Sequence, residues 1–224
     1  ELTEKLIEEG AAIHYEDSSD QIPASFRDAS STLVIYTPAI PETHKEFTYF
    51  RENGFEIQKR SQVLGMLTRA GKGLCVAGTH GKTTTTSMIS EILLAAQTDP
   101  TISVGGILSS IHGNLRVGDS EYFISEACEY TNSFLNFRPR YSIILNIEAE
   151  HLDFFKDIND IRHSFRRFAE LLPADGALII NADTPKYEEI IKELPCKVIT
   201  YSLEKEADYT ADNITYDEFG HASF

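Results

Sequence analysis

Residues 76–86 read Val76-Ala77-Gly78-Thr79-His80-Gly81-Lys82-Thr83-Thr84-Thr85-Thr86. In this stretch, apolar residues are followed by two glycines, then by Gly-Lys-Thr, and then by a segment that favours helix. Glycines let the backbone curl so that several N–H groups point at one anion, and a following helix adds free N–H groups and the positive end of its dipole. The stretch therefore predicts a phosphate-binding loop. We expect Lys82 to reach the β- and γ-phosphates of a nucleotide and the Thr83 hydroxyl to bind Mg²⁺.

The loop departs from the common nucleotide-binding pattern G-x-x-x-x-G-K-[S/T], because the first glycine of that pattern would fall at Val76. A shorter form, G-T-H-G-K-T-T-T, remains. A glycine-rich turn that only caps a helix is the structural alternative, since an exposed lysine there needs no anion. The predicted nucleotide-binding residues are Gly78, Thr79, His80, Gly81, Lys82, Thr83 and Thr84.

Composition and charge exclude several classes of protein. The chain has 224 residues, of which 42% are hydrophobic, a value typical of globular domains. No apolar run approaches the roughly 18 residues of a membrane helix, so we expect no membrane partner. The net charge of −15 argues against nucleic acid as a partner, because a polyanion needs a basic face. The three cysteines are widely spaced without a C-x-x-C pattern, which fits a cytoplasmic protein and gives no zinc site.

Strand-like and helix-like segments alternate along the chain, and this rhythm predicts an α/β fold with an open, mostly parallel sheet. We expect a partial Rossmann-like domain over residues 1–70 and a P-loop NTPase-like central domain over residues 71–224, with a linker at 71–73. Expected strands cover residues 11–15, 32–36, 55–57, 74–77, 102–104, 122–125, 141–146, 177–181 and 197–201. Expected helices cover the first ten residues and residues 43–53, 61–70 (with Ser61 as N-cap), 82–96, 158–172 and 186–193.

The sequence at both ends of the chain suggests truncation. The first residues form an acidic amphipathic helix with no strand before it. Residues 214–224 read as two alternating segments around a turn, and the second segment is short. We therefore expect the chain to be a fragment of a longer polypeptide.

Polar side chains follow several of the expected strands. Ligands of open α/β sheets bind at the carboxyl ends of the strands, so these side chains are candidates for a site. A carboxylate at a strand end near the loop, such as Glu126, suits Mg²⁺, and His151 beside carboxylates can bind metal or relay a proton. The alternative for both residues is that they are ordinary polar loop residues exposed to solvent. The candidates are Thr79, His80, Glu126, Glu129, Asn146, Glu148, Glu150 and His151.

Three motifs in this order resemble those of the Mur ligases. The loop G-T-H-G-K-T-T-T resembles the family's ATP loop. Glu126-Ala127-Cys128-Glu129 resembles the family stretch E-A-D-E, with cysteine where aspartate is usual. Residues 146–153 resemble N-I-E-A-D-H-x-D, with Glu150 in place of aspartate, and residues 101–106 resemble a substrate-facing V-G-G segment. The similarity spans essentially the whole chain.

The resemblance implies domains and roles. Residues 1–70 would be part of a domain that binds the UDP end of the substrate, and residues 71–224 would be most of the central ATP-binding domain, incomplete at its end. The family's third domain, which brings the amino acid, would be missing. The matching positions imply that Lys82, Glu126 and His151 are catalytic, and that the metal ligands are Thr83, Glu126 and His151.

The resemblance also implies ATP and Mg²⁺ as cofactors and a ligase of peptidoglycan precursor synthesis. Family members that add later peptide residues carry a modified lysine in the helix after the D-H motif, whereas this chain has no lysine between Lys156 and Lys186. This favours the branch that joins L-alanine to UDP-N-acetylmuramate through an acyl phosphate. A tripeptide-recycling ligase of the same superfamily and an inactive ATP-binding fragment stay open. A GTPase is disfavoured by the lack of N-K-x-D, and a dinucleotide oxidoreductase by the lack of G-x-G-x-x-G.

Overall fold

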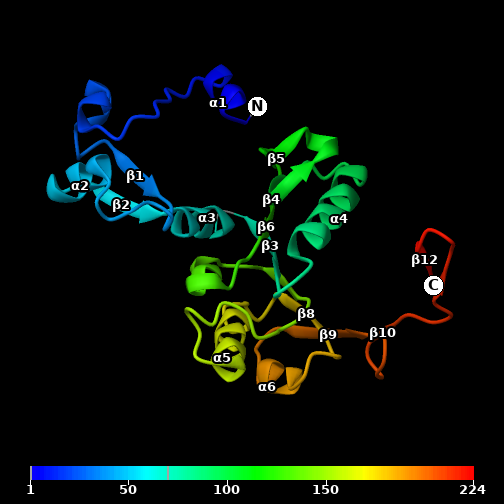
Figure 1. Cartoon of the computed structure of the whole chain (residues 1–224). Helices are drawn as coiled ribbons and strands as arrows, with labels where there is room; N and C mark the ends of the chain where they lie inside the picture. The colour runs from blue at the N-terminus through cyan, green and yellow to red at the C-terminus, as the bar shows by residue number, and fades with distance from the viewer. Residues whose placement is uncertain (1, 70) are drawn as a thin grey trace. The chain divides into compact units, whose positions relative to one another are not determined.

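The computed structural model describes residues 2–69 and 71–224 and divides the chain into two compact units, residues 1–64 and 65–224 (Figure 1). Helices and strands alternate in both units, and the larger unit contains a mostly parallel sheet. The predicted α/β class is therefore confirmed. Within the described ranges, no helix is both long enough and apolar enough to cross a membrane.

The first unit contains a two-stranded parallel sheet in which Leu33 lies opposite Glu56. The ring of Phe50 packs edge-on against that of Phe55, with 4.9 Å between the centroids, and this contact joins a helix to the start of a strand. The elements of this unit are α1 (Leu2–Glu8), η1 (Ser19–Gln21), η2 (Ala24–Phe26), β1 (Leu33–Tyr36), α2 (Lys45–Glu52), β2 (Glu56–Lys59) and the start of α3 (Arg60–Arg69).

Two predictions in this unit are wrong. The expected strand at 11–15 is irregular and exposed, and it pairs with no strand in the described part of the chain. Ser61 lies inside α3 and does not cap it. The side chain of Gln62 accepts a hydrogen bond from the Lys59 backbone N–H at 2.7 Å, so the helix starts earlier than expected. The expected end of this helix at Ala70 lies outside the described residues.

The second unit is built on an eight-stranded sheet with the order β10-β9-β8-β7-β3-β6-β4-β5. All neighbouring pairs are parallel except β4 and β5, an antiparallel pair at one edge that the sequence did not predict. Lys72 and Gly73 belong to β3, so they are not a linker as predicted; Lys72 pairs with Tyr122 of β6. The strands are β3 (Lys72–Ala77), β4 (Thr101–Leu108), β5 (Gly113–Arg116), β6 (Tyr122–Glu126), β7 (Tyr141–Ile144), β8 (Ala177–Asn181), β9 (Lys197–Ser202) and β10 (Tyr209–Thr210).

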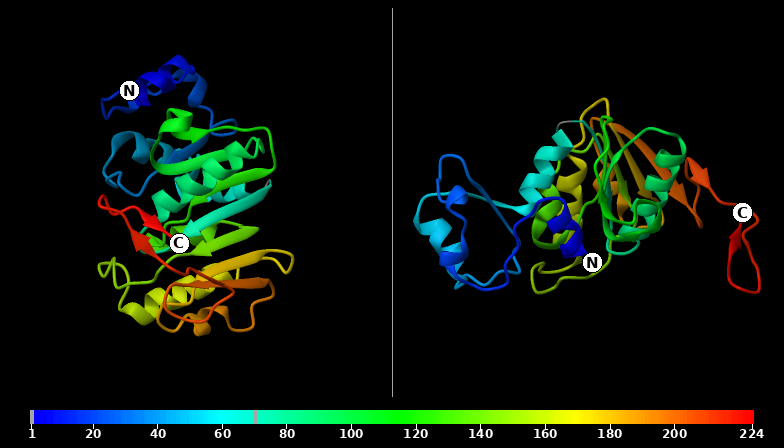
Figure 2. Two further views of the ribbon diagram at one scale, coloured as in Figure 1. Left: turned by 90° about the vertical axis from the view of Figure 1, so that its right-hand side faces the viewer. Right: turned by 90° about the horizontal axis from the view of Figure 1, so that it is seen from above.

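Helices cover both faces of this sheet, with α4 on one face and α5 on the other (Figure 2). The Asp157 carboxylate begins α5 by accepting the backbone N–H groups of Asp160 at 2.9 Å and Asn159 at 2.7 Å, and these bonds lower the pKa of Asp157. The helices are α4 (Lys82–Ala95), η3 (Ser109–Ile111), η4 (Tyr130–Asn136), α5 (Ile158–Ala169) and α6 (Tyr187–Ile191). The alternating segments predicted near the end form an antiparallel hairpin of β11 (Thr215–Tyr216) and β12 (Ala222–Ser223).

The register of the central strands brings the predicted motifs together at the carboxyl ends of these strands. Strand β3 lies between β6 and β7, and Val76 is level with both Glu126 and Ile143. The three strands are parallel, so the loop after β3, the Glu126 strand end and the polar segment after β7 leave the sheet side by side. The loop therefore becomes a neighbour of two motifs that follow it by more than 40 residues in the sequence.

Candidate active site

The glycine-rich loop connects β3 directly to α4. Gly78 has a φ of +143° and Gly81, the N-cap of α4, has a φ of +82°, both in the region that side chains disfavour. A Cβ on Gly78 would also lie 3.0 Å from the Leu145 Cβ atom. The first turn of α4 begins at Lys82, so its backbone N–H groups have no partner within the helix and are free for an anion.

Hydrogen bonds fasten the loop to the segment that follows β7. The Asn146 side chain accepts from the His80 backbone N–H at 2.7 Å and donates to the His80 carbonyl at 3.1 Å. The Asn146 carbonyl accepts from Thr79 N–H at 3.1 Å, and the Thr79 hydroxyl accepts from the Glu148 N–H at 2.9 Å. Asn146, to which the sequence assigned no role, is therefore an anchor for the loop.

The Lys82 ammonium lies inside the curve of the loop. It donates to the carbonyl of Gly78 and, at 3.1 Å, to that of Thr79. It also contacts both carboxylate oxygens of Glu129, at 3.1 and 3.3 Å. The Glu129 side chain is only 3% exposed, and a buried carboxylate is stable only with a cation or several donors beside it.

Glu129 also reaches His151, whose Nε2 atom lies 3.6 Å from a Glu129 carboxylate oxygen. The His151 ring lies against the Tyr130 ring, with centroids 4.5 Å apart, and His151 has a φ of +55°. The Tyr130 hydroxyl donates to the Asp153 carboxylate at 2.7 Å, which holds the pKa of the Tyr130 phenol above its ordinary value. Tyr130 is not predicted as a site residue, and Glu129 is predicted only as one of the polar candidates.

Glu126 points elsewhere, toward β4. One of its carboxylate oxygens accepts the Gly105 backbone N–H at 2.5 Å, and a Cβ on Gly105 would lie 2.8 Å from the other oxygen. A Cβ on the next residue, Gly106, would lie 3.2 Å from the Thr83 methyl group. Thr83 and Glu126 are therefore both beside the same glycine pair, separate from the contacts of Glu129.

The residues that the sequence assigned to metal thus form two groups. Thr83 and Glu126 make one. His151 belongs to the other, in which ligand atoms of Glu129, Glu150 and His151 all lie within 4.8 Å of one another. Carboxylate oxygens and an imidazole nitrogen are donors that suit a divalent cation.

The remaining loop residues lie at the surface. The ring of His80 is exposed, with Nε2 3.6 Å from a Glu148 oxygen and 3.7 Å from a Glu150 oxygen. Thr84 is exposed on the first turn of α4. Of the cysteines, Cys128 is exposed beside the site, whereas Cys75 is buried in β3, and burial raises the pKa of its thiol to about 12.

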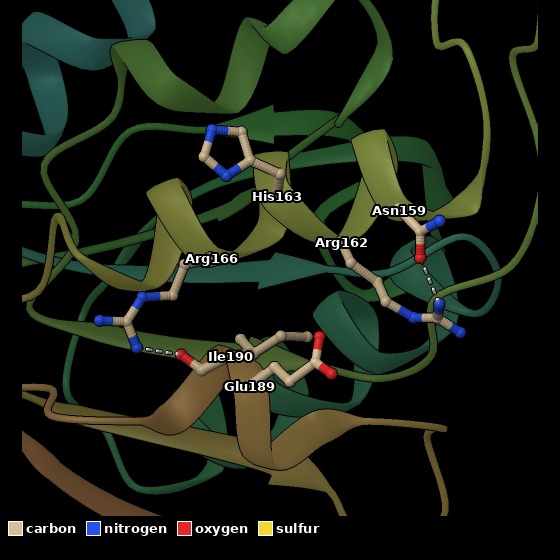
Figure 3. Close-up of a pocket in the computed structure, with 6 residues that line it drawn as sticks. All are labelled: Asn159, Arg162, His163, Arg166, Glu189 and Ile190. Atoms are coloured by element: carbon tan, nitrogen blue, oxygen red, sulfur yellow. Dashed lines mark hydrogen bonds between the residues drawn. The ribbon is translucent and has the colours of Figure 1, made fainter.

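A cavity of about 180 Å³ lies between α5 and α6 and contains none of the predicted site residues (Figure 3). Arg166 donates to the Ile190 carbonyl at 2.8 Å, and Arg162 donates to Asn159 at 3.2 Å. The hydrogen bond from Arg166 to Ile190 joins the two helices, so the side chains that line this cavity serve to pack α5 against α6. It is lined by Asn159, Arg162, His163, Arg166, Glu189 and Ile190.

Known proteins resemble the chain along its whole length. It is 61% identical to a UDP-N-acetylmuramate–L-alanine ligase from Agathobacter rectalis and 48% identical to one from Clostridium perfringens, with 100% of the chain covered in each. The chain spans about half the length of these curated relatives, 48% of each.

Solved structures show the same fold. The UDP-N-acetylmuramate-alanine ligase MurC from Thermotoga maritima is 27% identical, with a TM-score of 0.78 over 96% of this chain and 47% of that one. A murein peptide ligase from Psychrobacter arcticus, 23% identical, has a TM-score of 0.80 over 97% of this chain and 49% of that one, and it supports the fold alone.

Family models match both parts of the chain. The model of the Mur ligase family catalytic domain matches residues 1–72. The Mur ligase middle-domain model matches residues 76–224, which is more than half of the chain. These two matches show that the chain belongs to the Mur ligase family.

Proposed function

We propose that this chain supplies the ATP-binding part of a ligase that joins L-alanine to UDP-N-acetylmuramate. The observation that carries the proposal is the Lys82 ammonium, held inside a glycine loop where the ends of β3, β6 and β7 meet. The 61% identity to a relative named for this reaction supports the choice of substrates. Residues 71–224 would bind ATP and residues 1–70 the UDP end of the substrate, and the use of these nucleotides would place the reaction in the cytoplasm.

The reaction would proceed through an acyl phosphate. The γ-phosphoryl group of ATP passes to the muramic acid carboxylate, ADP leaves, and the amine of L-alanine then displaces phosphate to form the amide. Both partners in the first step are anions, so catalysis there is mostly alignment and charge neutralisation. Lys82 and the N-terminal turn of α4 would hold the phosphates, and no nucleophilic side chain is needed.

The two groups of donors fit the divalent cations that such a reaction uses. Thr83 and Glu126 would hold one Mg²⁺, and His151 a second one, with Glu129 and Glu150 near it. Bound Mg²⁺ would neutralise charge on the transferring phosphoryl group. Glu126, Lys82 and His151 would then be the catalytic residues of this half of the site, and Gly78, Thr79, His80, Gly81 and Thr84 would surround the phosphates.

The substrates are tested by ADP release from the full-length ligase. With ATP and UDP-N-acetylmuramate present, we expect sustained ADP release only after L-alanine is added, because the acyl phosphate needs an amine to turn over. Release that requires a murein tripeptide in place of L-alanine would identify a recycling ligase. ATP binding without release under either condition would identify an inactive nucleotide-binding module.

A further inference from the structure

Glu129 is a buried carboxylate that contacts two functional side chains at once, those of Lys82 and His151. Its two oxygens lie 3.1 and 3.3 Å from the Lys82 ammonium, and one of them lies 3.6 Å from His151. The Lys82 side chain is 16% exposed and that of His151 is 34% exposed, whereas Glu129 is 3% exposed. Glu129 therefore occupies the interior of the site and is paired with Lys82, the lysine proposed to bind phosphate.

The backbone around Glu129 is firmly held. Asn132 N–H donates to the Glu129 carbonyl at 2.9 Å, and Phe134 N–H donates to the Cys128 carbonyl at 2.9 Å. Thr131 and Asn132 have φ values of +54° and +58°, strained conformations that persist only where the surroundings fix them. Phe134, with no exposed surface, fixes this segment in the core. These contacts hold the backbone of Glu129 in place next to Lys82.

A phosphate that takes Lys82 must then lie close to the Glu129 carboxylate. Two anions at such short range in a partly buried site repel each other strongly. The repulsion is relieved when a cation joins the carboxylate, and the donor atoms of Glu150 and His151 lie within 4.8 Å of that of Glu129. Glu129 should therefore oppose the binding of metal-free ATP and favour the binding of ATP together with a divalent cation.

We infer that Glu129 is a positioning residue that makes ATP binding depend on Mg²⁺: it holds Lys82 before ATP binds and pairs with the cation beside His151 when the phosphates take the lysine. The inference rests on the proposed function, because it requires ATP at this loop. Glu129 can link the lysine to the cation because it contacts both Lys82 and His151.

The test is the affinity of the full-length ligase for ATP, measured by calorimetry in excess EDTA and in excess MgCl₂. Glu129→Gln keeps the shape of the side chain and removes its charge. We expect this variant to bind metal-free ATP about tenfold more tightly than the wild type and to lose most of the gain that Mg²⁺ gives. Glu129→Asp keeps the charge and should retain a Mg²⁺-dependent gain close to that of the wild type.

A matched control is available in the same sheet. Glu121 accepts a hydrogen bond from Lys72 at 2.6 Å, at the start of β3, so Glu121→Gln removes a carboxylate–lysine pair away from the loop and should leave both affinities unchanged. An unchanged ratio between the affinities of Glu129→Gln with and without Mg²⁺ would overturn the inference and leave the proposed function standing. A wild-type protein that binds no ATP would overturn the proposed function and the inference with it.

Discussion

Lys82→Ala should lower the kcat/KM of the full-length ligase about 10³-fold, the scale observed when a preorganised donor to a developing charge is removed. The ammonium lies inside the loop, on the carbonyls of Gly78 and Thr79, where the β- and γ-phosphates would lie. No other lysine or arginine of the described residues contacts Glu129 in its place. The measurement is steady-state ADP release with all three substrates.

Lys72→Ala is the matched control, because Lys72 lies at the start of β3, the strand that leads into the loop, and pairs with the exposed Glu121. It should leave kcat/KM close to the wild-type value. A loss of less than tenfold in Lys82→Ala would contradict the assignment of the loop.

The loss of rate can be separated from a loss of stability. Lys82→Ala removes the ammonium that contacts the buried Glu129 carboxylate, so a lower Tm is expected. Adding Glu129→Gln removes that stranded charge and should restore the Tm. The double variant should remain inactive, because Lys82 is still absent.

Phe168→Ala should lower the free energy of unfolding of the larger unit by about 3–5 kcal/mol. Phe168 has no exposed surface, and its ring stacks on that of Phe134 with centroids 4.7 Å apart and an interplanar angle of 2°. Alanine would leave a cavity between α5 and η4. Since domains are stable by only about 5–15 kcal/mol, this is a large fraction of the total. Urea unfolding followed by circular dichroism measures the change.

Phe219→Ala provides the comparison, since this phenylalanine is 76% exposed near the end of the chain and should contribute little. A change below about 1 kcal/mol in Phe168→Ala would show that the aromatic contact is not part of the core. The substitution also bears on the site, because Phe134 holds the segment that carries Glu129.

The loop and the strands around it could be predicted from the sequence because their signals are local. A glycine at a positive φ, such as Gly81, and an apolar run ending in polar residues need only a few neighbouring residues to be recognised. The parallel sheet follows from the alternation of strands and helices. The same local reasoning fails at residues 11–15, which pair with no strand in the described part of the chain, and at Ser61, because the helix already begins at Arg60.

The pairing inside the site depends on contacts between segments far apart in the sequence. Glu126 stands at a strand end, which predicts a site residue there, yet its carboxylate accepts a hydrogen bond from the Gly105 N–H. Glu129, three residues further, turns inward to Lys82 and His151 because η4 folds back with Thr131 in a left-handed conformation. No periodic pattern in the sequence predicts this inward orientation of Glu129. The edge strand β5 was missed for a similar reason, since its pairing with β4 is a tertiary feature.

The central claim is that ATP phosphates bind the loop and the first turn of α4. The direct measurement is amide hydrogen exchange of the full-length ligase with and without saturating ATP and MgCl₂. The N–H groups of residues 81–84 should exchange more slowly with nucleotide, because phosphate oxygens accept from them. Residues 215–223 of the terminal hairpin should be unaffected. Unchanged exchange at residues 81–84 under saturating ATP would contradict the claim.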